Sequence, residues 1–152
     1  MKKMLKKNVI AAALSVALMG GSFGSFCHAA EPTSYTDYVD MDVCYTGAII
    51  DCRGLGLSTA MSPVIEDTTG QKIYGDKDLN PDVVIKKGMA SYAHSFDDAA
   101  VARAGKNPII LKAVGVTNHG MYPVVEETDG ELLHYSTIRN NYFKNAAVVF
   151  IR

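Results

Sequence analysis

The sequence is short of several residue types on which common protein classes depend. It has no tryptophan and only three cysteines, four histidines and five prolines in 152 residues. So few cysteines exclude a disulfide-rich scaffold. The histidines show neither an HxH nor an HExxH spacing, so no local zinc motif is present. No GxSxG motif marks a serine nucleophile.

Basic charge and long apolar runs are also scarce. The first 30 residues carry four lysines and no acid, so the remainder has 11 basic and 16 acidic side chains. This excess of acids argues against nucleic acid as a partner. No apolar run reaches the 18 or more residues typical of a membrane span, so no transmembrane segment is expected after removal of the leader.

The N-terminus has the pattern of a secretory signal peptide. A basic head precedes an apolar run over 9–19 and a small, polar stretch over 20–30. We predict a signal peptide over 1–30, cleaved near Ala29 or Ala30, and an exported, periplasmic or cell-surface protein. A lipid anchor at Cys27 is not expected, because bulky Phe26 precedes it where lipobox sequences have a small residue.

After the signal peptide, the sequence predicts a flexible lead-in over 31–42 and a single α/β (α+β) domain over 43–152. The expected fold is a mixed sheet of about six or seven short strands with two or three short helices. Apolar runs and turn signals place the strands. They are expected near 43–51, 63–67, 72–74, 88–93, 108–117, 121–126 and 146–151.

Capping residues place the helices. Asn80 and Pro81 begin a short one, and Ser95 begins a second that ends at Gly105. A capping-box pattern over 128–131 begins a third, which runs to about Asn140 with Leu132, Tyr135 and Ile138 facing inward. The run 108–117 is predicted to be a central strand, and Pro123 to mark an edge or the start of a strand.

The most distinctive stretch is 45–63, where an apolar strand runs into a glycine-rich bend. Asp51 and Arg53 are two residues apart, so they share a face of a regular strand. Their favoured interpretation is a salt bridge that closes the strand onto the bend, and the alternative is a binding or catalytic pair. Gly54 and Gly56 resemble part of a dinucleotide loop, but Thr59 stands where a third small residue is needed.

Other residues are weaker candidates for chemistry. The thiol of Cys52 stands beside an arginine that can lower its pKa. The histidines His94, His119 and His134 are interpreted as unrelated surface residues. Asp76, Asp78 and Asp82 alternate like calcium ligands, but the glycine and glutamate of an EF-hand are missing. No disulfide between Cys44 and Cys52 is expected, nor any cofactor, metal or catalytic residue.

The chain resembles the C-terminal domain of flagellum-associated envelope proteins of the FlgP and FlgT type, and related uncharacterised exported bacterial proteins. The resemblance rests on these parts, in chain order: 45–47, Asp51, 53–55, 62–63, Asp67, Gly70, 74–75, Gly88, 91–93, 107–109 and 112–113. It implies a non-enzymatic envelope accessory protein that contacts other envelope proteins or a second copy of itself. It implies structural rather than catalytic roles for its motif residues: Asp51, Arg53, Gly54, Gly56, Pro63 and Gly70.

Overall fold

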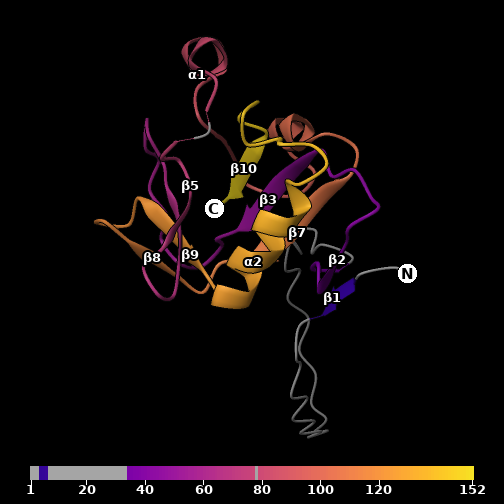
Figure 1. Ribbon diagram of the computed structural model, residues 1–152. Helices are drawn as coiled ribbons and strands as arrows, with labels where there is room; N and C mark the ends of the chain where they lie inside the picture. The colour runs from indigo at the N-terminus through magenta and orange to yellow at the C-terminus, as the bar shows by residue number, and fades with distance from the viewer. Residues whose placement is uncertain (1–3, 7–33, 78) are drawn as a thin grey trace, which may run out of the picture.

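The structure is a computed structural model that describes residues 4–6, 34–77 and 79–152 (Figure 1). It confirms a small α+β domain, but the strands form two four-stranded sheets instead of one mixed sheet. The predicted signal peptide lies outside the described residues except for 4–6. These three residues form β1 (Met4–Lys6), which pairs antiparallel with β2 (Tyr38–Asp40).

The first sheet is entirely parallel. Its order is β6 (Ser91–Ala93), β10 (Val148–Ile151), β3 (Gly47–Asp51) and β7 (Pro108–Lys112). Every residue of β10 and β3 is buried. Their apolar runs fit this position because both faces of a central parallel strand are covered. The expected C-terminal strand is therefore confirmed, and β3 begins four residues later than predicted.

The second sheet is mixed. Its order is β5 (Lys72–Tyr74), β4 (Ile65–Asp67), β9 (Tyr122–Val125) and β8 (Gly115–Thr117). The predicted hairpin between β4 and β5 is confirmed. Gly70 has a φ of +85° and donates its N–H to the carbonyl of Asp67 at 2.9 Å. The carboxylate of Asp67 also accepts the N–H groups of Thr69 and Gln71, which fixes the turn.

The prediction of one central strand over 108–117 was wrong. The run divides into β7, at an edge of the parallel sheet, and β8, at an edge of the mixed sheet. Ala113 donates its N–H to Asp51 in one sheet, and Val114 donates its N–H to Val124 in the other. The chain therefore passes between sheets at that peptide. Pro123 is the second residue of β9, which lies inside the mixed sheet and not at its edge.

Two short helices begin at side-chain caps. α1 (Pro81–Lys87) begins as predicted, with the Asn80 side chain accepting the N–H of Asp82. The helix expected from Ser95 is instead the 3₁₀ helix η1 (Ala99–Ala104), which ends at Gly105 as expected. Asp98, three residues after Ser95, caps it by accepting the N–H of Ala100.

The third helix, α2 (Glu127–Ser136), begins before the predicted capping box and ends earlier than expected. Its N-cap residue, Glu126, makes no side-chain capping bond, and the N–H of Gly130 donates to the carbonyl of Glu126 at 2.9 Å. Leu132 and Leu133 face the core, whereas Tyr135 and Ile138 are exposed. The inward face therefore differs from the prediction at two of its three positions.

The core lies between the two sheets and α2, with a smaller cluster between the parallel sheet and η1. The lead-in, expected to lack regular structure, contains β2 and buries Val39 completely. Thr36 donates its N–H to the carbonyl of Ile110, and its hydroxyl accepts the N–H of Ile110. The lead-in therefore pairs with the outer side of β7.

Candidate functional site

The bend after β3 is built on an ion pair. Asp51 ends β3 and is 3 % exposed. Arg53 donates its backbone N–H and its Nε to Oδ1 of Asp51, at 3.1 and 2.9 Å, and its terminal nitrogen to Oδ2 at 2.8 Å. This two-pronged geometry is the strong form of an arginine–carboxylate contact.

Two more segments contact the same pair. The hydroxyl of Tyr35 donates to Oδ2 of Asp51 at 2.7 Å, and the guanidinium carbon of Arg53 lies 5.3 Å from the centre of the Phe96 ring. The lead-in, the bend and the loop after β6 therefore meet at one ion pair. Both charges are used to hold the protein together, and the Arg53 side chain is only 20 % exposed.

Burial and hydrogen bonding act in opposite directions on the acid. Burial raises the pKa of Asp51, but the hydrogen bonds from Arg53 and Tyr35 outweigh it and hold the pKa below its usual value. The thiol beside it behaves differently. Burial first, and then the charge of Asp51, raise the pKa of Cys52 to about 12. The expected lowering by Arg53 is wrong, and Cys52 is not positioned to act as a thiolate nucleophile.

The two glycines shape the bend. Gly54 and Gly56 have φ of +78° and +71°, which side chains rarely adopt. The bend then contacts the turn between β8 and β9, where Ser58 donates its N–H to the carbonyl of Gly120 at 2.8 Å. Buried Pro63 follows shortly before β4, and no helix lies between. The bend therefore lacks the helix N-terminus that a dinucleotide site needs.

The other candidates do not assemble with the bend into a metal site. His94 follows β6, His119 lies in the turn between β8 and β9, and His134 lies on α2. Among the described residues no group of three side chains could hold a metal ion. Of the alternating acids, Asp78 lies outside the described residues.

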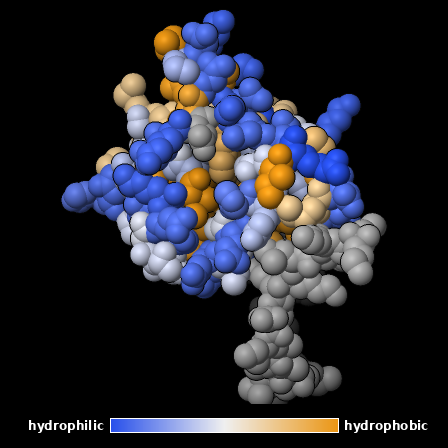
Figure 2. Space-filling view, in the orientation of Figure 1, coloured by the Kyte–Doolittle hydropathy of each residue, from blue (hydrophilic) through white to orange (hydrophobic). Residues whose placement is uncertain are grey.

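A groove beside β5 was not found from the sequence. A hollow of about 540 Å³ lies between β5 and α2, and a second of about 190 Å³ continues along residues 72–77. The two share Lys72, Ile73 and Phe143. A third hollow, of about 590 Å³, continues from Lys77 to Lys144. We call the three hollows together the β5 groove. Figure 2 shows an apolar spot between β5 and α2 with hydrophilic side chains around it.

The helix α1 projects from the body of the protein (Figure 1). None of its residues is buried, and Ile85 is 82 % exposed. Figure 2 shows hydrophobic side chains at this tip. Arg103 holds the base of the projection by donating to the carbonyls of Lys87 and Gly88 at 2.8 and 2.6 Å. The projection is thus attached firmly but presents apolar surface to its surroundings.

Residues 47–152 match the family defined by the second domain of Treponema pallidum Tp0624. The chain belongs to this family. The match begins at the first residue of β3 and includes both four-stranded sheets, the bend, α1 and α2. No curated protein matches the chain. The Tp0624 second-domain match does not confirm the finer resemblance to FlgP and FlgT.

Proposed function

We propose that this chain is an exported, non-enzymatic accessory protein of the cell envelope. It acts through contacts with other envelope proteins, in the assembly of a flagellum or another outer-membrane structure. The signal-peptide pattern and the resemblance to FlgP- and FlgT-type proteins support this proposal. Within the described ranges, no helix has the length and apolar composition needed to cross a bilayer.

The observation that carries the proposal is the use of Asp51 and Arg53 inside the fold. A catalytic pair faces a cleft, whereas these two side chains bond to each other, to Tyr35 and against Phe96. The hollows described above are lined by other residues. Exposed apolar side chains occur elsewhere, with Met61 95 % and Ile85 82 % exposed. Ile85 lies on the projecting helix α1, and we therefore use it to test for a contact with another protein.

A ligand-binding or enzymatic site near 51–56 was the alternative from the sequence. The carboxyl ends of β3, β6, β7 and β10 do meet at that edge, where open parallel sheets place their ligands. However, the carboxylate of Asp51 already accepts four donors there. A substrate would have to displace these bonds, so the alternative has less support.

The proposal is tested by crosslinking in the protein's own cells. A photo-crosslinking residue replaces Ile85 on α1 in one strain and exposed Lys106, after η1, in a control strain. We expect mass spectrometry to identify an envelope protein from the first strain and not from the second. If neither strain gives a crosslinked protein, or the protein is recovered from the cytoplasm, the proposal is wrong.

A further inference from the structure

The strand β5 is an open edge of the mixed sheet. Within the described residues it pairs with β4 alone. A strand with one partner directs half of its backbone N–H and C=O groups away from the sheet. An extended peptide can add to such an edge, with main-chain hydrogen bonds giving affinity and side-chain pockets giving specificity.

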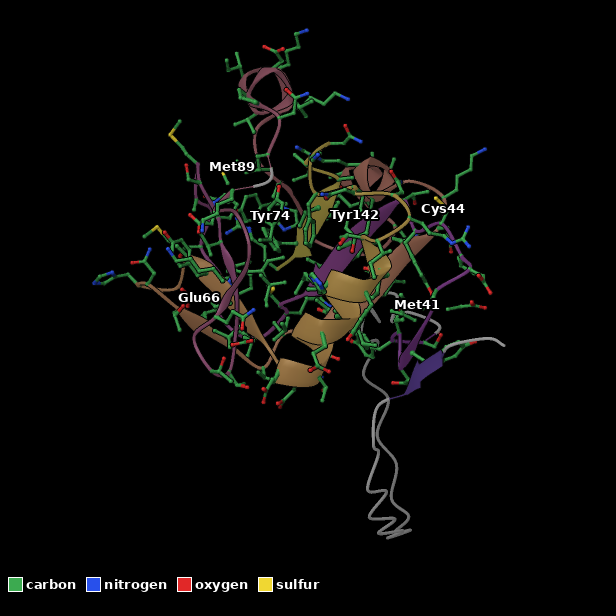
Figure 3. The ribbon with its side chains drawn as sticks, in the orientation of Figure 1. Met41, Cys44, Glu66, Tyr74, Met89 and Tyr142 are labelled. Atoms are coloured by element: carbon green, nitrogen blue, oxygen red, sulfur yellow. The ribbon has the colours of Figure 1, made fainter. Side chains whose placement is uncertain are left out.

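The β5 groove provides those pockets. The two hollows along β5 both include Ile73 and Phe143, whose apolar side chains form the floor of the groove. The ring of Phe143 packs against Tyr74 in a tilted arrangement, with centroids 4.8 Å apart, and the Tyr74 hydroxyl donates to the carbonyl of Met89 at 2.5 Å (Figure 3). Tyr74 and Phe143 are both buried, so the floor is formed before any ligand arrives.

The helix α2 forms the opposite wall. Gly130 allows the helix to lie close to the hairpin, because a Cβ there would be 3.1 Å from Cδ1 of Ile73. Beside this contact, β5 and α2 together line the open hollow of about 540 Å³. Glu127, Glu131 and Tyr135, four residues apart on one face of α2, line the hollow.

The charges along the groove differ at its two ends. The exposed carboxylates Glu127 and Glu131 lie at the α2 end, whereas Lys77 and Lys144 line the far end without an acid. The charges between them, Lys72 and Asp76, are of opposite sign. A segment that is basic at one end and acidic at the other would therefore meet complementary charge at both.

We propose that the β5 groove binds an extended segment of another envelope protein as a fifth strand beside β5. A basic side chain of the segment lies over Glu127 and Glu131, an apolar one lies on Phe143, and an acidic one lies near Lys77 and Lys144. This inference rests on the proposed function and gives it a contact site in addition to the tip of α1. A second copy of this chain is a poorer occupant. The β5 of a second copy spans only three residues, about 10 Å, so symmetric pairing of two such strands offers few hydrogen bonds.

The probe is a phage-displayed library of random twelve-residue peptides, selected on protein purified from the cells that export it. Enriched peptides are made synthetically, and binding is measured by fluorescence anisotropy. The test variant is Glu131→Lys. The matched control is Asp97→Lys, the same charge change at an exposed residue of the loop after β6. Backbone hydrogen exchange of residues 71–75 is measured with and without peptide.

We expect enriched peptides with a basic–apolar–acidic order, which protect 71–75 from exchange. Glu131→Lys should weaken their binding about fivefold or more, because it replaces an attractive charge pair by a repulsive one, and Asp97→Lys should change it little. The inference is overturned by a library without enrichment, by equal binding to Glu131→Lys, or by protection confined to another segment. It is also overturned if the purified protein sediments as a dimer with 71–75 protected. Crosslinks from Ile85 to envelope proteins would still support the broader proposal in each of these cases.

Discussion

Replacing Asp51 by alanine tests whether the ion pair serves the fold. The substitution removes an acceptor of four hydrogen bonds, three from Arg53 and one from Tyr35. Breaking a buried pair by removing one partner costs about 3–5 kcal/mol. Because the Arg53 side chain is 20 % exposed and can reach water, we expect the lower end, about 3 kcal/mol.

The matched variants are Arg53→Ala and the double substitution. Arg53→Ala leaves Asp51 with Tyr35 and with the backbone N–H of residue 53, so we expect a loss of about 2 kcal/mol. The double variant should lose about 1–2 kcal/mol less free energy of unfolding than the two single losses added together, because each single change leaves an unpaired partner. Urea unfolding monitored by circular dichroism measures all three. A loss below about 1 kcal/mol for Asp51→Ala would refute the structural role and favour a functional pair.

The lowered pKa of Asp51 also predicts that the stability of the fold depends on pH. The folded pKa of Asp51 is below its unfolded value, so its contribution is complete above about pH 4 and is lost as the pH falls through the folded pKa. The pKa values of Asp67 and Asp98 are lowered as well. Stability should therefore fall steeply below pH 4, and less steeply in Asp51→Asn. Equal slopes for the two proteins would contradict this account.

Three further predictions follow from single features of the fold. Deleting Val148–Arg152 should abolish cooperative thermal unfolding, because β10 lies between β6 and β3 with every residue buried; a truncated protein of unchanged Tm would refute this. Gly47→Ala should cost at least about 3 kcal/mol in urea unfolding, because its Cβ would lie 2.5 Å from a backbone oxygen, whereas Gly115→Ala, in open space, should cost little. A thiol reagent at pH 8 should modify exposed Cys44 at once and Cys52, with its pKa of about 12, only on unfolding; equal rates would show that Cys52 is accessible.

The strands and the first helix could be predicted where local chemistry determines them. β10 is a β-branched, apolar run that only a buried central strand can accommodate, and Asn80 with Pro81 caps α1 in the expected way. The residues 108–117 show the limit of such patterns. Their continuous apolar run does not reveal that the chain leaves one sheet for the other near Ala113, because Val114 and Val116 are as apolar as the buried residues of β7 although Val114 is exposed and Val116 is only partly buried.

The helix starts failed for a related reason. Two neighbouring residues, Ser95 and Asp98, can each cap a helix, and the choice depends on where the chain must pack against the parallel sheet. At α2 the capping-box pattern over 128–131 is not used as a cap, since the helix begins at Glu127. Local propensity therefore predicts that a helix exists more reliably than where it begins.

The contact between Asp51 and Arg53 could be predicted because the two residues are close in sequence. Tyr35 and Phe96, which complete the cluster, come from segments whose approach depends on the whole fold. The β5 groove could not be predicted for the same reason. That β5 is a strand follows from its residues, but that it is an edge with α2 beside it follows only from the order of the sheet.

The β7 edge of the parallel sheet is covered by the lead-in, whereas β5, at an edge of the mixed sheet, pairs with β4 alone among the described residues. This difference favours the β5 groove as a contact site. Thr36 covers the outer side of β7 with two hydrogen bonds, so that edge is closed by the chain's own lead-in. The lead-in precedes the matched range of the Tp0624 second-domain family, whereas β5 and α2 lie inside it. Proteins usually protect exposed strand edges against unwanted pairing. An edge that instead borders an apolar groove with opposite charges at its ends, within the family domain itself, is suited to pairing with a chosen partner.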